Sequence, residues 1–488
     1  MILGEYWKMH DDLTIGKIDQ AAVKLLVEGG ARIENKKMLD LLEPAGCRID
    51  RAGHRCYFTE KLIRDAVKRM GGKTQRQVNI PPGWNPQYRL AHGGSHPHFL
   101  DWPSGERRLA TKQDVVNMAK MAHVLNEYAE IGRVLTCGEV EQRVEPLWAI
   151  YQLARITDKK ISGGEVFYAD YLEPLMRMGE VLSGKSADTS LIAPCDFWIA
   201  PLVMDPHQAE CFLEKRRLGL ETMIGTMPVS GMSSPVTVAG TVTVAVAELL
   251  AGWVLGYLVN PALPASGIVA SASLDMRTMS ACFGSPEAVL QNISTANIAS
   301  RLYGIPVWAA VNYTDCKIPG FTAAFMKMYN TIGSVFGSNR NLVCDGLLSA
   351  GQDYSPVQQM LECEMNKAID RFWGHYEVND ETIALDLMQK IMRDPGANLL
   401  EEEHTFTHYK KEQWYPRWID RSQWRGTEFE AAGEPEMMKR IDTYCKDAIR
   451  RYEQPSLDQA KLAELKKIFL HFERNVLGSN ATTLEWEL

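Results

Sequence analysis

LIAPCDFWIAPLVMDPHQAECFLEKRRLGLETMIGTMPV, residues 191–229, decides the fold of this chain. Its short apolar runs at 191–197 and 222–229 predict strands, and the segment between them at 206–220 has the spacing of a helix. A strand, a helix and a strand in this order predict two parallel strands with the helix packed against them.

The same alternation continues on either side of this stretch. Further strands are predicted at 131–137, 160–166, 266–273, 306–314 and 341–348, with helices at 146–157, 170–182 and 286–304. Seven such units in one run favour an α/β fold of the TIM (β/α)8 barrel type over a doubly wound sheet. No GxGxxG follows any of these strands, which also disfavours a dinucleotide-binding fold. HPHFLDW at 96–102 is the candidate for the eighth strand.

The rest of the chain predicts two extensions of this barrel. Residues 1–110 read as a helical N-terminal extension that ends in a hairpin region, because helical spacing up to about residue 69 gives way to a segment rich in Gly and Pro. The barrel is expected at 111–375. Residues 376–488 are acidic, helical and rich in Trp, and we expect a helical C-terminal extension packed on the barrel.

Composition narrows the class of protein. The net charge is −8 with 45% hydrophobic residues, which is typical of a folded globular protein and argues against nucleic acid as a partner. The ten cysteines form no CxxC pair, and the first residues lack the apolar core of a secretory signal. A cytoplasmic protein with reduced thiols is therefore expected.

One apolar segment, 236–260, is long enough to span a bilayer. It contains Glu248, Gly252 and Gly256 and has no basic flank. It also lies between predicted strands, so a helix buried in the α/β core is the better interpretation, and no membrane association is expected.

Reactive side chains of a TIM barrel lie at the carboxyl ends of its strands. In this sequence those positions carry many rings and carboxylates, few cations and no histidine. They are Glu139, Glu165, Phe167, Tyr168, Asp196, Phe197, Trp198, Ser230, Ser273, Asp275, Tyr313, Thr314, Asp315, Lys317, Asp353 and Tyr354. Such a set suits a cation without hydrogen-bond donors, since each ring face attracts a quaternary ammonium by roughly 0.5–2 kcal/mol. For any single ring, packing on the barrel core is the better interpretation, so the hypothesis depends on the concentration of rings at strand ends.

Other chemistries remain open on these residues alone. Four cysteines near strand ends could form a zinc-thiolate site, although no histidine accompanies them; they are Cys137, Cys195, Cys316 and Cys344. His404 and His408 have the spacing of a metal pair on a helix, but they lie outside the barrel repeat. Lys317 could form a Schiff base, although a salt bridge with Asp315 is the simpler account.

Several stretches resemble the trimethylamine:corrinoid methyltransferase superfamily. The resemblance is carried by AGCRIDRAGHRCYF at 45–58, by 234–264, by LDMRTMSACFGSPE from Leu274, by YTDCKIPGFTAAF from Tyr313 and by 401–421. Their order and spacing together are specific, and they span nearly the whole chain.

The resemblance implies a TIM-barrel enzyme that passes a methyl group from an amine to the Co(I) of a corrinoid. That corrinoid is carried by a partner protein, so this chain is expected to bind no metal itself, and a homo-oligomer is expected. Founding members hold a pyrrolysine in the barrel, at a position that falls at or next to Gly320–Phe321 here. Because this sequence has only standard residues, it resembles the pyrrolysine-free branch, whose known members demethylate quaternary amines such as glycine betaine, proline betaine or carnitine.

Leaving-group chemistry supports a quaternary amine, because its nitrogen is already cationic and leaves as a neutral tertiary amine. The chain then needs no acid–base catalytic residue, only groups that position and desolvate the cation. The expected substrate-binding residues are Tyr168, Phe197, Trp198, Asn312, Tyr313, Phe321 and Tyr354. Negative potential is expected from Glu139, Glu165, Asp315 and Glu362.

A betaine would also need a cation for its carboxylate, and Arg277 and Arg340 are the nearest candidates. The alternatives are a zinc-thiolate methyltransferase or hydrolase on the same scaffold, a lysine-dependent aldolase and a non-catalytic quaternary-amine-binding protein.

Overall fold

The structure is a computed structural model that describes residues 10–71, 88–90, 96–310, 312–337, 343–373, 376–394, 396–422 and 433–478. A parallel sheet of four strands lies at its centre. In spatial order, which is also chain order, the strands are β9 (Cys195–Phe197), β11 (Met223–Thr226), β13 (Gly267–Val269) and β16 (Val307–Ala309). The connecting helices are α7 (Pro206–Arg217), α8 (Val238–Val259) and α9 (Pro286–Tyr303). The strand–helix–strand unit predicted at 191–229 is thus confirmed.

A second parallel group precedes this sheet. It contains β4 (Tyr88–Leu90), β7 (Tyr128–Ile131) and β8 (Lys160–Ile161). The next α-helices in the chain after β4, β7 and β8 are, in that order, α4 (Lys112–Val124), α5 (Glu145–Ala154) and α6 (Leu172–Ser183). A parallel bridge between Gly164 and Ile192 connects the segment after β8 to the segment that leads into β9.

The stretch predicted as an eighth strand, 96–102, contains β5 (His98–Leu100). β5 pairs in parallel with β18 (Asp353–Tyr354) and forms a hairpin with β6 (Arg107–Leu109), and β17 (Leu347–Leu348) completes this sheet. A parallel bridge joins His96 to Leu135. The hairpin predicted before residue 110 is therefore present, whereas residues 72–87 and 91–95 lie outside the described residues.

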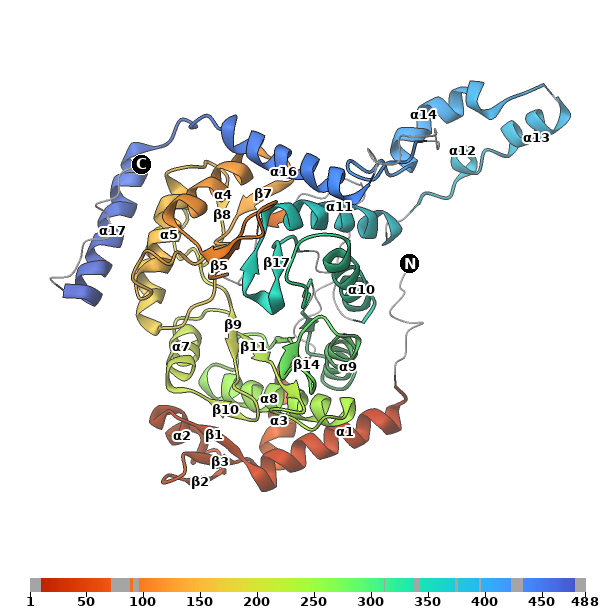
Figure 1. Cartoon of the computed structure of the whole chain (residues 1–488). Helices are drawn as coiled ribbons and strands as arrows, with labels where there is room; N and C mark the ends of the chain where they lie inside the picture. The colour runs from red at the N-terminus through yellow and green to blue at the C-terminus, as the bar shows by residue number, and fades with distance from the viewer. Residues whose placement is uncertain are drawn as a thin grey trace.

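Helices surround the strands. Figure 1 shows α4, α5, α7, α8 and α9 around the outside, followed by α10 (Phe321–Gly337) and α11 (Pro356–Trp373). A further small sheet consists of β12 (Val229–Ser230), β14 (Ala272–Asp275) and β15 (Ser280–Cys282), in that order. The molecule is a mixed α/β protein, as predicted.

The two faces of the parallel sheet are packed differently. Asp196 in β9 is fully buried and forms an ion pair with Lys215 of α7 at 2.9 Å, so this face lies against the helices. Its neighbours Cys195 and Phe197 point the other way and are only half-buried. Ile268 in β13 and Trp308 in β16 repeat the alternation. The face opposite the helices is therefore partly accessible.

Helix α8 covers the outer face of the sheet and explains the long apolar segment. It is apolar and long enough to cross a membrane, but 78% of its most apolar window is buried. Gly252 allows close packing, since a Cβ there would lie 2.6 Å from the Ile224 side chain. Glu248 accepts hydrogen bonds from Thr226 Oγ1 at 2.6 Å and from the Leu202 amide at 2.8 Å. The interpretation as a core helix is thus confirmed.

The N-terminal extension packs against α8. Its helices are α1 (Asp12–Lys24), α2 (Lys36–Leu42) and α3 (Glu60–Met70). The expectation of helix throughout is wrong, since β1 (Ala31–Ile33), β2 (Arg48–Asp50) and β3 (Arg55–Tyr57) form a small sheet with β10 (Val203–Met204). The reason is a tight turn in which Asp50 accepts hydrogen bonds from the amides of Ala52 and Gly53, and this turn folds β3 back on β2.

The C-terminal extension has two parts. α16 (Glu434–Arg450) packs on α4 and α11, and α17 (Gln459–Leu477) packs on α5 and α6. The segment before them contains α12 (Asp380–Ile383), α13 (Leu385–Arg393) and α14 (Glu403–Glu412), and Figure 1 shows it projecting away from the body. The predicted packing of the C-terminal extension on the body of the protein is therefore found for α16 and α17.

Candidate functional site

Glu165 follows β8 after Ser162 and two glycines, beyond the carboxyl end of that strand. Its side chain is half-buried and has no hydrogen-bond partner among the described residues. Burial raises the pKa of Glu165 to about 7, and the nearby charges of Arg133 and Lys215 only partly oppose this effect. A half-buried carboxyl that accepts no hydrogen bond from the described residues can attract a cationic ligand.

Tyr313 follows β16 and lies near the same carboxyl. Its ring stacks on Phe283 with centroids 5.3 Å apart. Burial raises the pKa of the Tyr313 phenol, and the charges of Glu165 and Asp345 add to this shift. Since such charge effects act over short distances, Tyr313 brings an aromatic ring to the acidic end of the strands.

Cys195 and Phe197 belong to the same accessible face of β9. The Phe197 ring lies directly over Gly225 of the neighbouring strand, where a Cβ would come within 2.5 Å of it. Burial and then the Glu165 charge raise the pKa of the Cys195 thiol to about 12. The thiol is thus uncharged at neutral pH and contributes soft apolar surface.

Arg133 is a charged residue near Glu165 that the sequence reasoning missed. It lies two residues beyond β7 and is 6% exposed, and its Nη1 donates to Glu145 Oε2 at 2.6 Å. Its Nη2 lies 3.4 Å from the position that a Cβ on Gly164 would occupy, which places the guanidinium beside the Glu165 segment. The signal in the sequence was a single charged residue inside the otherwise apolar run IGRVLTC at 131–137.

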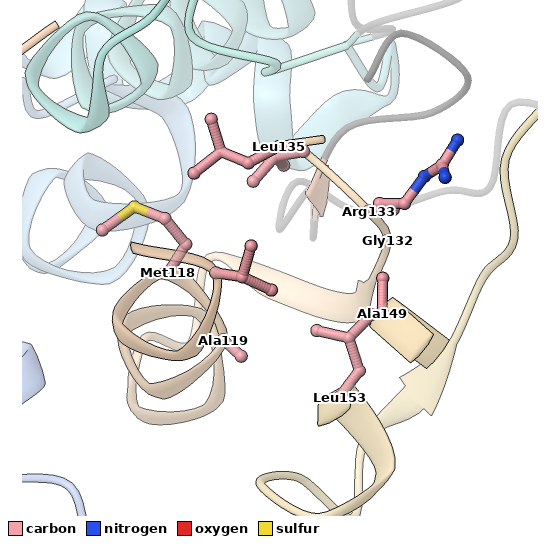
Figure 2. A pocket seen from close by; sticks show the side chains of 9 residues that line it. Met118, Ala119, Gly132, Arg133, Leu135, Ala149 and Leu153 are labelled. Carbon is pink, nitrogen blue, oxygen red and sulfur yellow. The ribbon is translucent and has the colours of Figure 1, made fainter. Parts of the chain in front are cut away.

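Arg133 is also among the residues that line a small apolar pocket, which Figure 2 shows. The pocket lies between α4, α5 and the strand that they cover, and its lining includes Met118, Leu135 and Leu153. The guanidinium of Arg133 points away from these side chains. The pocket is therefore a packing void behind the strand, and the charged end of Arg133 is directed to the other side.

Two predicted aromatic residues lie in the core instead. Trp198 is 1% exposed and belongs to the core cluster under α8, because it points to the opposite side of the chain from Phe197. Tyr354 is fully buried, and its hydroxyl donates to Gln359 Oε1 at 2.6 Å. Neither ring is available to a ligand in this conformation.

Asn312 and Glu362 belong to a buried polar network. Asn312 Nδ2 donates to Glu362 Oε2 at 2.7 Å and to Asp345 Oδ1 at 2.8 Å. The ammonium of Lys327 forms an ion pair with Glu362 and lies 3.4 Å from Asp345. Although burial raises the pKa of Glu362 to about 7, its charge is engaged by Lys327 and does not face a ligand.

Two of the predicted acids stabilise backbone elsewhere. Glu139 is exposed and accepts a hydrogen bond from the Lys112 amide at 2.7 Å, which caps the first turn of α4. Asp315 accepts hydrogen bonds from the amides of Phe283 and Gly284 and thereby holds the loop that carries the ring stacked on Tyr313. Asp315 therefore positions Phe283, and its influence on Tyr313 is indirect.

Tyr168 and Phe321 contact other side chains. The Arg143 guanidinium covers the Tyr168 ring at 3.8 Å, and His207 lies beside it. Phe321 is 68% exposed at the start of α10, where it stacks on Phe325. The position next to Gly320 is thus at an exposed helix start.

The other candidate groups do not converge. Arg277 is exposed and paired with Asp275 at 2.7 Å, and Arg340 lies outside the described residues. Lys317 is exposed. His408 pairs with Glu381 on the projecting segment. Within the described ranges, no three His, Cys, Asp or Glu side chains are grouped so that they could hold a metal ion.

The structure of this α/β protein thus brings a carboxyl, a phenol ring and a buried arginine to the carboxyl ends of parallel strands, where ligands of such folds bind. The chain belongs to the trimethylamine methyltransferase (MTTB) family, whose model matches residues 4–474.

Relatives and a solved structure have similar lengths. The chain is 24% identical to trimethylamine methyltransferase MttB of Desulfitobacterium hafniense strain DCB-2, over 92% of this chain and 91% of the relative. It is 25% identical to glycine betaine methyltransferase of Desulfitobacterium hafniense strain Y51, over 95% and 97%. Monomethylamine methyltransferase of Methanosarcina barkeri matches with a TM-score of 0.43 at 13% identity, over 91% and 95%.

Proposed function

We propose that this chain transfers a methyl group from a quaternary amine, such as glycine betaine, to the Co(I) corrinoid of a partner protein. The observation that carries the proposal is the site around Glu165, where a carboxyl without a hydrogen-bond partner among the described residues lies near Tyr313. A relative named glycine betaine methyltransferase supports the choice of amine.

The chain's residues would bind and orient the cation. Tyr313 and Phe197 offer ring faces to the methyl groups, and Glu165 supplies the opposite charge. When docked, the corrinoid would supply the electron pair that forms the new bond to the methyl carbon. The carbon–nitrogen bond breaks and its electron pair stays on nitrogen, which leaves as a neutral tertiary amine. No proton moves, so an acid–base residue is not needed.

The partner would dock over the carboxyl ends of the strands. Large apolar side chains in the loops after β11, β12, β14 and β16, and at the start of α10, are exposed there, each by 41% or more. They are Met227, Met232, Met276, Met279, Ile318 and Phe321. Methionine is an adaptable contact residue, and an exposed apolar rim around a site favours association with another protein. We expect this apolar rim to contact the partner protein, which would bring its corrinoid to the carboxyl ends of the strands.

We further propose that the strands close into an eight-stranded barrel, with its boundaries near residues 111 and 375. The chain order of β9 to β16, the surrounding helices and the alternation of buried and half-buried residues support this. We also propose that the protein is a cytoplasmic homo-oligomer that binds neither nucleic acid nor membrane. The burial of α8 supports the proposal that it does not bind a membrane.

A substrate screen tests the function. Purified chain is mixed anaerobically with cob(I)alamin and a panel of quaternary amines, and methylcobalamin absorbance is followed. Turnover with at least one quaternary amine and none with trimethylamine is expected. Absence of methyl transfer across the panel would refute the proposal. Binding of an amine without transfer would then support the non-catalytic alternative.

A further inference from the structure

Arg133 has hydrogen-bonding capacity that the fold does not use. Its side chain is 5% exposed, and burial of a guanidinium normally requires that its donors be paired. Nη1 donates to Glu145, but among the described residues neither the buried Nε nor Nη2 has a hydrogen-bond partner. One edge of a buried cation is therefore unpaired in the described structure.

The unpaired edge has the geometry that carboxylates require. Nε and the adjacent Nη present two parallel N–H groups, which match the two oxygens of a carboxylate. The Glu145 contact holds the guanidinium in place, since Glu145 is itself fixed by the Cys137 amide at 3.0 Å. Gly164 has no side chain to cover Nη2, which lies 3.4 Å from where its Cβ would be.

The charges around this edge fit a zwitterion. Arg133 is already neutralised by Glu145, at 2.6 Å, while Glu165 has no hydrogen-bonded cation among the described residues. Arg133 acts on Glu165 electrostatically, but the two side chains form no hydrogen bond, so opposite charges stand near one another without being joined. A ligand that carries a cation and a carboxylate can satisfy both and adds no net charge to the site.

We propose that Arg133 binds the carboxylate of a zwitterionic methylated amine, while Glu165 faces its ammonium group. This inference rests on the proposed function and narrows its substrate class to betaines. Arg133 is then the residue that distinguishes a betaine from an amine of the same head group without a carboxylate, such as choline.

Equilibrium binding tests this assignment without relying on methyl transfer. Glycine betaine and choline, which share the trimethylammonium group, are titrated calorimetrically into wild-type chain and into Arg133→Gln. Because a lone Glu145 would be buried unpaired, the double variant Arg133→Gln/Glu145→Gln replaces the ion pair by two amides and guards against misfolding. Arg155→Gln, at the other end of α5, is the matched control for loss of an arginine.

We expect the double variant to bind glycine betaine about 10- to 100-fold more weakly than wild type, with choline affinity changed less than about twofold. Arg155→Gln should bind both ligands as wild type does. Equal weakening of both ligands, unchanged betaine affinity, or a wild type that does not prefer the betaine would each overturn the assignment. Carboxylate-selective binding without methyl transfer would instead leave the assignment standing and refute the proposed function.

Discussion

Replacement of Glu165 by Gln gives the most informative prediction, because a quaternary ammonium has no proton to lose. Any pH dependence of its binding must come from the protein, apart from a substrate carboxylate that titrates at much lower pH. Burial raises the pKa of Glu165 to about 7, so the carboxyl is neutral in mild acid and charged above neutrality. The affinity for the cation should therefore rise with pH through about 7, and this rise should vanish in Glu165→Gln.

The size of the effect follows from Coulomb's law. A carboxylate about 5 Å from the ammonium, at an effective dielectric constant of about 20, attracts it by about 3 kcal/mol. Because Glu165 is half-buried, solvent screening reduces this value. We expect affinity to change about 10- to 100-fold between pH 5.5 and 8.5.

The same shift has a consequence for stability. A carboxyl with a raised folded-state pKa favours the folded state below its unfolded pKa, near 4.5, and this advantage is lost as pH rises to about 7. The loss is at most about 3 kcal/mol, so Glu165→Gln should be more stable than wild type at pH 8 by up to that amount.

Calorimetric binding and urea unfolding at several pH values check both expectations. Glu248→Gln is the matched control, because burial also raises the pKa of Glu248 to about 7, but this carboxyl lies on α8 behind the sheet. It should alter stability and leave the pH dependence of binding intact. A pH dependence that survives in Glu165→Gln would refute the assignment of the cation site.

Three further substitutions test the packing around the site. Asp196→Ala leaves Lys215 buried without its partner and should cost about 3–5 kcal/mol in urea unfolding, whereas replacement of both by apolar residues should cost far less. Trp198→Ala should lower stability by about 3–5 kcal/mol without changing the ratio of betaine to choline affinity, because this ring is in the core. Glu139→Ala should cost at most about 1 kcal/mol, as loss of a helix cap, and should leave kcat/KM unchanged; a large loss of activity would show that it faces substrate.

The strand and helix alternation could be predicted because it depends on local periodicity. The strand at 191–197 and the helix at 206–220 differ in spacing of apolar residues, and the structure contains β9 and α7 there. The turn after Asp50 was missed because the short strands beside it have only three residues each, too few to show a period of two.

The site could be predicted only in part, because a strand end does not reveal which way a side chain points. Phe197 and Trp198 are adjacent in sequence, yet one is on the accessible face and the other is in the core. From sequence alone Glu362 is as good a candidate as Glu165, but in the structure Lys327 forms an ion pair with it. Arg133 was missed because its role depends on a partner, Glu145, that only the tertiary structure brings to it.

Methyl transfer itself is tested most directly with glycine betaine whose N-methyl carbons are carbon-13. The labelled betaine is incubated with wild-type chain and cob(I)alamin, and the products are read by carbon-13 NMR. We expect one labelled methyl on cobalt for each molecule of dimethylglycine released. Label that stays entirely on the betaine, with the ligand demonstrably bound, would contradict the account.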